Sequence, residues 1–147
     1  MKITIGSDHG AVELKEEVKK VLAEFTDVEV KDVGTFGTAS VDYPDIAEKV
    51  CADVVSGKSE RGIVLCGTGI GISIAANKIK GIRCALCHDV FSAKMSREHN
   101  NANVLAMGGR VIGYGPAGEI VRAWVAAEFE GGRHERRVNK IMALENV

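Results

Sequence analysis

The sequence predicts an α/β protein in which one parallel sheet of five strands is covered by helices on both faces. The first observation is that short runs rich in β-branched residues alternate with amphipathic segments of helical period up to about residue 129. The second is the run Ile63-Val64-Leu65-Cys66, because consecutive apolar residues are typical of a strand buried on both faces. Alternating strands and helices form parallel sheets with right-handed crossovers, so we expect a Rossmann-like three-layer α/β/α domain.

The predicted strands are the apolar runs at residues 3–7, 28–33, 62–66, 83–87 and 103–106. Helices are expected at residues 14–25, after Pro44, and at residues 69–78, 89–98 and 116–129. In the first helix Leu14, Val18 and Leu22 share one face, and Lys15 and other charged residues lie off that apolar stripe. Ligands of such sheets bind beyond the carboxyl ends of the strands, so we expect all functional loops at that edge.

A basic segment of different character follows the diglycine at residues 131 and 132. Residues 133–147 begin with arginines and carry Val138, Ile141, Met142 and Leu144 at helical spacing. We expect the diglycine to end the preceding helix, so that residues 1–130 form the Rossmann-like domain that carries the chemistry and residues 131–147 form a helical arm. A second subunit is the expected cover for the apolar stripe of the arm, which predicts a homodimer.

Composition argues against several classes of partner. The net charge is −1 and only 5% of residues are aromatic, which gives nucleic acid little to bind. No apolar run is long enough to cross a bilayer, and the N-terminal segment lacks the pattern of a secretory signal. The cysteines lie within or beside apolar runs, as buried thiols do in a reducing compartment. We therefore expect a cytoplasmic protein that binds neither nucleic acid nor a membrane.

The segment CGTGIGIS at residues 66–73 joins the third strand to a helix and is the strongest candidate for a functional site. Its glycines let backbone N–H groups approach a ligand, and the start of a helix adds unpaired donors. A thiolate at Cys66 beside such donors could abstract a proton from a carbon next to a carbonyl. The alternative is a simple glycine turn beside an inert buried cysteine. The third glycine of a dinucleotide-binding loop and the lysine of a P-loop are both absent.

Three further groups could carry chemistry or have purely structural roles. Asp8 and His9 end the first strand and could act as acid, base or phosphate ligand, although Asp8 could also cap the first helix. His99 and Asn100 precede the fifth strand, in a segment whose asparagines also favour turns. The arginines at positions 133 and 137 lie one helical turn apart and could grip a phosphate, or could form an ordinary solvated surface.

Cys84 and Cys87 form a C-x-x-C motif, which occurs in redox pairs and in zinc sites. Here the motif lies in a predicted strand, where residues three apart point to opposite faces. No second C-x-x-C motif accompanies it. We therefore interpret both cysteines as core residues. Backbone donors and a thiolate would suffice to stabilise the anion that proton abstraction next to a carbonyl produces, so we expect neither a metal nor a cofactor.

Taken together, these motifs resemble the ribose/galactose-6-phosphate isomerase family, and the match runs from one end of the chain to the other. It rests on six short blocks, taken in order: GSDH at 6–9, DYP at 42–44, GIVLCGTGIG at 62–71, AANK at 75–78, SREHN at 96–100 and EGGRHERR at 130–137. Some members of the family have a glutamate base at the position of Ile72 and lack the cysteine. This chain has Cys66 instead, and so resembles the thiol branch.

The resemblance implies an isomerase of the pentose phosphate pathway that interconverts D-ribose 5-phosphate and D-ribulose 5-phosphate through a cis-enediolate. Cys66 would be the base, Thr68 would assist proton exchange between O1 and O2, and Asp8 with His99 would open the sugar ring. The residues implied in substrate binding are His9, Tyr43, Gly67, Gly69, Ile70, Gly71, Ser73, Asn100, Arg110, Arg133, His134 and Arg137. His99 would come from the partner subunit of a homodimer, or of a tetramer, whose active sites are shared between subunits.

Other functions fit parts of the sequence. The substrate could be another aldose phosphate, such as allose 6-phosphate or galactose 6-phosphate, or the chain could bind a sugar phosphate without turnover. A flavodoxin-like nucleotide binder would share the sheet, and a thiol-redox protein would use Cys84 and Cys87.

Overall fold

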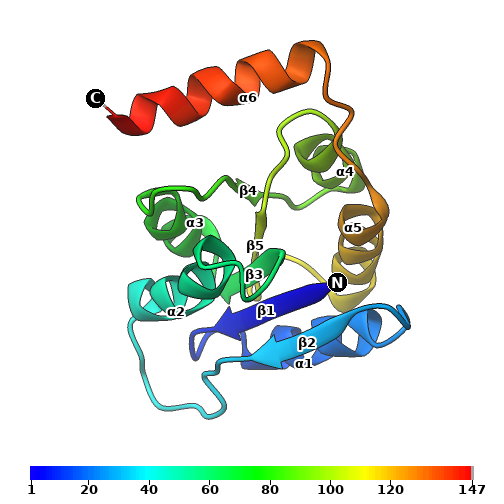
Figure 1. The fold of residues 1–147 in the computed structure, drawn as a ribbon. Coiled ribbons are helices and arrows are strands. Elements are labelled where there is room, and N and C mark those ends of the chain that lie inside the picture. The colour runs from blue at the N-terminus through cyan, green and yellow to red at the C-terminus, as the bar shows by residue number, and fades with distance from the viewer. Residues whose placement is uncertain (147) are drawn as a thin grey trace.

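The computed structural model describes residues 1–146 and contains one sheet of five parallel strands (Figure 1). The strand order is β2-β1-β3-β5-β4. The strands are β1 (Lys2–Ser7), β2 (Glu29–Asp32), β3 (Arg61–Cys66), β4 (Cys84–Leu86) and β5 (Val104–Gly108). Ile5 pairs with Ile63, Ile63 pairs with Leu105, and Leu105 pairs with Ala85. These four residues therefore lie side by side on four adjacent strands. The predicted α/β fold class is confirmed.

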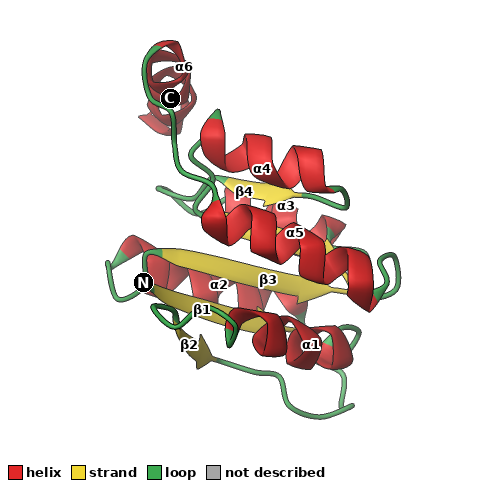
Figure 2. Ribbon diagram, turned by 90° about the vertical axis from the view of Figure 1, so that its right-hand side faces the viewer, coloured by secondary structure: helices red, strands yellow, loops and turns green. Residues whose placement is uncertain are grey.

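Helices cover both faces of the sheet, and one further helix lies beyond β4, the outermost strand on that side (Figures 1 and 2). One face carries α1 (Val12–Leu22), α4 (Val90–Glu98) and α5 (Tyr114–Ala126). The other face carries α2 (Tyr43–Val55) and α3 (Ile70–Asn77). The helix beyond the edge is α6 (Arg133–Ala143), followed by a 3₁₀ turn, Leu144–Asn146. The predicted arm ended at Val147, which lies outside the described residues. Over residues 1–146, no helix is both long enough and apolar enough to span a bilayer.

The helix α5 differs from its prediction at both ends. It begins at Tyr114 rather than at Pro116, and the proline falls in the first turn, where its missing N–H costs nothing. It ends at Ala126 rather than at residue 129. The reason is Arg61, whose guanidinium donates to the carbonyl oxygen of Trp124 at 2.8 Å and so satisfies an acceptor at the helix end.

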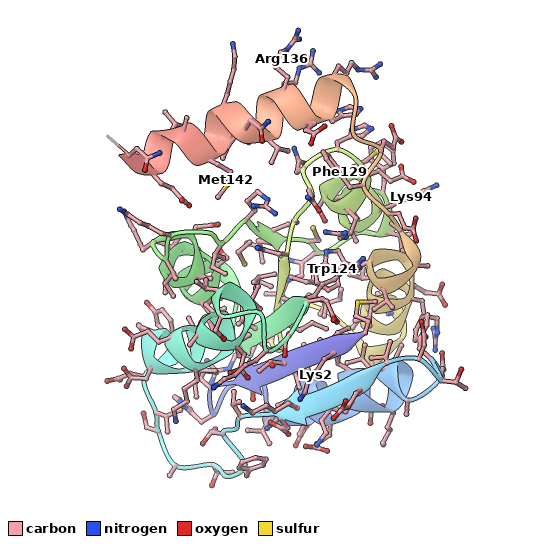
Figure 3. The ribbon with its side chains drawn as sticks, viewed as in Figure 1. Lys2, Lys94, Trp124, Phe129, Arg136 and Met142 are labelled. Atoms are coloured by element: carbon pink, nitrogen blue, oxygen red, sulfur yellow. The ribbon has the colours of Figure 1, made fainter. Side chains whose placement is uncertain are left out.

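The core lies on both faces of the sheet, as the third strand predicted. Ile63 and Leu65 belong to the cluster under α1 and α5, and Val64 and Cys66 belong to the cluster under α2 and α3. Trp124 is fully buried in the first cluster, between α5 and the sheet (Figure 3). Consecutive strand residues point to opposite faces, so a strand that is covered on both sides needs an unbroken apolar run.

The C-x-x-C cysteines follow the same rule. Cys87 belongs to the cluster under α1 and α5, whereas Cys84 packs against the cluster under α2 and α3, and both thiols are free. Burial raises the pKa of Cys87 to about 11 and the pKa of Cys51 to about 12, and it also raises the pKa of Cys84. The interpretation of Cys84 and Cys87 as core residues is confirmed.

Lys15 of α1 is completely buried. It lies seven residues, or about two helical turns, before Leu22 and so borders the buried stripe, and the prediction that placed it off that stripe is wrong. Its Nζ lies 2.9 Å from Oδ1 of Asp32, at the end of β2, and donates to the carbonyl oxygen of Thr35 at 2.6 Å. Lys19 pairs with Oδ2 of Asp32 at 3.0 Å. Burial opposes ionisation of Asp32, but hydrogen bonds from Lys15, from the N–H of Gly34 and from Lys19 outweigh it. Together they hold the pKa of Asp32 below its usual value.

The variant Asp32→Asn should be less stable than the wild type at pH 7 by about 3 kcal/mol, because the buried ammonium of Lys15 loses its counter-ion. The pKa of Asp32 is lower in the folded state than in the unfolded state. The stabilisation is therefore fully present above about pH 4 and is lost as the pH falls through the folded-state pKa. Urea unfolding at pH 7 and pH 3 measures the difference.

The matched control is Glu16→Gln, which removes an exposed partner of Lys19 at 3.4 Å. It should change the free energy of unfolding by less than about 0.5 kcal/mol. If Asp32→Asn did not lower the free energy of unfolding at pH 7, or lowered it equally at both pH values, the ion pair with Lys15 would not stabilise the fold as proposed.

Candidate active site

The first candidate group lies in the turn between β3 and α3, at the carboxyl edge of the sheet. The N–H of Gly69 donates to Sγ of Cys66 at 3.1 Å, and Cys66 is 4% exposed. Gly69 has a φ of +77°, and a Cβ there would lie 2.7 Å from the carbonyl carbon of Met107, so both conformation and space require glycine. The sulfur therefore faces a backbone donor at the start of a helix.

The turn and the first residues of α3 supply the remaining donors. The N–H of Ile70 donates to Oγ1 of Thr68 at 3.2 Å. Ser73 uses its own donors inside the helix: its N–H bonds to the carbonyl of Gly69 at 3.2 Å and its hydroxyl to the carbonyl of Ile70 at 2.7 Å. Because the first N–H groups of a helix lack intrahelical acceptors, the donors open to an anion lie in the turn and the first helical residues, before Ser73.

The loop after β1 brings Asp8 and His9 to the same edge. Oδ1 of Asp8 accepts a hydrogen bond from the N–H of Gly10 at 2.9 Å, and α1 begins at Val12 without a side-chain cap. The interpretation of Asp8 as a helix cap is therefore wrong, because its side chain closes a tight turn instead. Nδ1 of His9 accepts a hydrogen bond from the N–H of Val41 at 3.2 Å, which places the proton of a neutral His9 on Nε2.

The loop after β5 packs against both of these loops. The N–H of Gly109 donates to the carbonyl of Cys66 at 2.8 Å, and the N–H of Arg110 donates to the carbonyl of Gly67 at 2.9 Å. A Cβ on Gly67 would lie 3.2 Å from the Arg110 guanidinium, and a Cβ on Gly10 would lie 3.2 Å from the nitrogen of Gly67. The loops that follow β1, β3 and β5 therefore form one packed surface.

An aromatic ring and a cavity complete this group. The ring of Tyr43, at the start of α2, lies against Gly71, where a Cβ would be 2.5 Å from it. A cavity of about 390 Å³ is lined in part by His9, Phe36 and Arg110. The predicted residues that the structure brings together here, called the carboxyl-edge group below, are Asp8, His9, Tyr43, Cys66, Thr68 and Arg110.

The other predicted side chains gather around the start of α6. His99 ends α4, and its ring stacks on that of His134 with centroids 4.0 Å apart and planes 9° apart. The N–H of Glu130 donates to the carbonyl of Glu98 at 3.0 Å, which ties the approach to α6 to the end of α4. Burial, His99 and Arg133 lower the pKa of His134 and favour its neutral form. This amino-edge group comprises His99, Asn100, Arg133, His134 and Arg137.

The side chains of His99, Glu130 and His134 hold possible ligand atoms within 4.8 Å of one another. Nε2 of His134 lies 3.5 Å from Oε2 of Glu130, a spacing that suits two ligands of one ion. An imidazole binds a metal through a lone pair in the plane of its ring, however, and these two rings are stacked almost parallel. One ion cannot lie in both ring planes, so the stack as placed does not suit a metal ion bound by both histidines.

The two groups lie at opposite edges of the sheet, so the prediction that all functional loops leave the carboxyl edge is wrong. Cys66 ends β3, whereas residues 99–103 precede β5, and the N–H of Gly62 near the start of β3 donates to the carbonyl of Asn103 at 2.9 Å. The helix α4 runs back across the sheet, so His99 at its end lies at the amino edge. From Gly62 to Cys66 the strand spans about 13 Å. His99 therefore lies far from the thiol of its own chain.

One histidine and one glutamate beside these groups were not predicted. Nε2 of His88 accepts a hydrogen bond from the N–H of Gly108 at 3.0 Å, and burial lowers its pKa. Its position directly after a strand is the signal that could have found it. Glu130 lies inside a block used for the family resemblance, but nothing in the local pattern indicated that its carboxylate would lie beside His134.

Residues 3–141 match the family model described as Ribose/Galactose Isomerase. Ribose-5-phosphate isomerase B of Escherichia coli is 49% identical over 144 residues, which cover 98% of this chain and 96% of that protein. D-erythrulose-4-phosphate isomerase of Pectobacterium atrosepticum is 45% identical over 150 residues, with 99% and 96% covered.

Solved structures agree with these relatives. The structure of Clostridium thermocellum ribose-5-phosphate isomerase B is 56% identical, with a TM-score of 0.96 and 99% and 98% of the two chains covered. Ribose-5-phosphate isomerase B from Mycoplasma genitalium, solved with bound ribulose-5-phosphate, is 39% identical, with a TM-score of 0.92 and 99% and 96% covered.

Iodoacetamide at pH 8 should alkylate Cys66 at least about tenfold faster than the other cysteines of the folded protein. Cys51, Cys84 and Cys87 have raised pKa values and stay protonated at this pH, whereas the sulfur of Cys66 accepts a backbone hydrogen bond. Mass spectrometry of peptides over time measures the four rates, and Cys66→Ser is the control that should lose the fast phase. Cys84 is the most exposed of the four, and if it reacted first the assignment of Cys66 as the reactive thiol would be wrong.

Proposed function

The chain belongs to the ribose/galactose isomerase family and is a sugar phosphate isomerase, and on this premise we propose that it interconverts D-ribose 5-phosphate and D-ribulose 5-phosphate. The family that the sequence motifs predicted is confirmed. The observation that carries the finer proposal is the sulfur of Cys66, held 3.1 Å from the N–H of Gly69 at the start of α3. A sulfur base beside backbone donors is the arrangement that proton transfer between two carbons of a sugar requires.

In the proposed reaction the Cys66 thiolate removes the proton from C2 of the open-chain aldose, and the electron pair moves onto the carbonyl oxygen at C1. The N–H groups at the start of α3 stabilise the resulting cis-enediolate. The hydroxyl of Thr68 assists transfer of a proton from O2 to O1, and the thiol returns its proton to C1, which leaves a carbonyl at C2. The proton taken by the thiolate returns to the substrate and no electrons leave it, so the reaction needs no outside oxidant or reductant.

The other half of the proposed site comes from a second subunit. Within one chain the amino-edge group lies at the opposite end of the sheet from Cys66, and a two-fold axis would present each group to the other chain in two equivalent sites. Arg133 and Arg137 lie one turn apart on α6 and would bind the phosphate dianion. His99 of one subunit and Asp8 of the other would then open the sugar ring. The remaining proposed contacts are those of His9, His134 and Arg110 with the phosphate and of Tyr43 and Asn100 with the sugar.

Exposed apolar side chains support this pairing. Ile74 of α3, Phe91 of α4 and Leu144 after α6 are 57%, 73% and 70% exposed. A cavity of about 610 Å³ separates α6 from residues 77–85. Met142 lines it from α6, whereas Arg136 points the other way (Figure 3). Exposed apolar surfaces of this kind mark interfaces with another subunit. We therefore propose that residues 1–130 form the catalytic domain and that residues 131–147 form an arm that packs on the partner subunit.

A second candidate substrate is a shorter sugar phosphate, because one close relative is named D-erythrulose-4-phosphate isomerase. A panel of ribose 5-phosphate, allose 6-phosphate, galactose 6-phosphate and D-erythrulose 4-phosphate separates the candidates by their kcat/KM values. The highest value for ribose 5-phosphate would support the proposal. Binding of all four without turnover would identify a sensor and overturn it.

Replacing Cys66 with alanine should lower kcat for ribose 5-phosphate by about 10³-fold or more and change KM by less than about threefold. The thiol acts on the reacting carbons, whereas the phosphate provides the binding. Cys84→Ala is the matched control and should keep normal kinetics, because Cys84 packs against the core. Normal turnover by Cys66→Ala would remove the basis of the proposed mechanism.

Mixing two inactive variants should restore activity if the sites are shared. We expect little turnover from Cys66→Ala, and little turnover at low substrate from a variant with Arg133→Ala and Arg137→Ala. When the two are unfolded together and refolded in equal amounts, half of the dimers are mixed and each holds one intact site, so about a quarter of wild-type activity should return. No recovery by refolded, dimeric material would place both groups of one site in a single chain.

A further inference from the structure

Lys15 lies at the centre of a buried contact set that reaches the edge of the candidate active site. Lysine is rarely completely buried, and each of its three donors then needs a partner. The Nζ of Lys15 lies 2.9 Å from Oδ1 of Asp32, donates to the carbonyl of Thr35 at 2.6 Å, and lies 4.2 Å from the centre of the Phe36 ring. Two of these three partners, Thr35 and Phe36, belong to the segment of residues 33–42 that connects β2 to α2.

The beginning of this segment is tied to the end of β1. The N–H of Ser7 donates to the carbonyl of Gly34 at 2.7 Å, and the N–H of Thr35 donates back to the carbonyl of Ser7 at 2.6 Å. The N–H of Gly34 also donates to Oδ1 of Asp32 at 2.8 Å, the same oxygen that Lys15 contacts. Ser7 is followed directly by Asp8 and then His9, so the segment and the candidate site share one anchor.

The other end of the segment holds His9 directly. The N–H of Val41 donates to Nδ1 of His9 at 3.2 Å, which leaves Nε2 of the neutral ring as a donor. His9 and Phe36 line the same cavity of about 390 Å³, together with Arg110. The segment therefore fixes the tautomer of His9 at one end and, through Phe36, forms part of the wall of the cavity that His9 faces.

We propose that Lys15 is a positioning residue for substrate binding: by holding residues 33–36 it keeps Val41 in place to orient His9. The inference rests on the proposed function, because His9 is there assigned to the phosphate. Lys15 itself is buried and touches no substrate. Its effect passes through the segment, and it should appear in KM and in the state of His9 more than in kcat.

The decisive variant is Lys15→Met, which keeps the aliphatic stem and removes the ammonium. We expect KM for ribose 5-phosphate to rise about tenfold while kcat falls less than about threefold. NMR of protein labelled with ¹⁵N at histidine should show a loss of the single Nε2–H tautomer of His9. The matched control is Lys19→Met. Lys19 also pairs with Asp32, at 3.0 Å, but it makes no hydrogen bond to Thr35 within residues 1–146. Replacing Lys19 should leave both the KM and the NMR signal of the His9 tautomer unchanged.

A folded Lys15→Met protein with wild-type KM and an unchanged His9 signal would overturn the inference, as would a Lys19→Met protein with the same defects as Lys15→Met. If Lys15→Met does not fold, Phe36→Ala decides, since Phe36 is 69% exposed and can be removed without emptying the core. We expect Phe36→Ala to raise KM about threefold, and an unchanged KM would count against the proposal. Wild-type protein without activity on ribose 5-phosphate would refute the proposed function alone, because the His9 tautomer can still be read in both lysine variants.

Discussion

The common direction of the five strands decides where chemistry can occur in this molecule. In a parallel sheet every segment that follows a strand lies at one edge, and every segment that precedes a strand lies at the other. Cys66 follows β3 and His99 precedes β5, so one chain carries the thiol and the histidine pair at opposite edges. A site that uses both, as we propose, needs two chains facing each other. We therefore propose that the exposed apolar side chains of α3 and α4, together with the arm α6, form the interface between these two chains.

Charge acts locally in this protein, whose net charge is only −1. At the carboxyl edge the donors are backbone N–H groups at the start of α3, which need no side-chain charge. At the amino edge the positive charge comes from Arg133 and Arg137, while His134 is held toward its neutral form. Also at the carboxyl edge, Lys15 and Asp32 form a buried ion pair that orders a loop rather than binding a ligand.

Local patterns predicted much of the fold because they record which face of an element a residue takes. The run from Ile63 to Cys66 indicated a strand buried on both faces, and residues three apart in a strand placed Cys84 and Cys87 on opposite sides. The same patterns failed where a distant residue decided the outcome. Arg61 ends α5 early by bonding its last carbonyl groups. Asp32 and Thr35 are the buried partners of Lys15, and no pattern within α1 could have indicated them.

The sequence alone predicted the order of strands and helices along the chain, because the hydrophobic period distinguishes a strand from a helix. Its motifs also resembled those of the isomerase family, to which the comparisons then assigned the chain. Only the tertiary structure decided that Asp8 closes a turn instead of capping a helix, that His99 stacks on His134, and that the two predicted groups lie apart. Those outcomes depend on how elements distant in sequence meet, and the free energy of such contacts is set by the assembled sheet, not by any one segment of the chain.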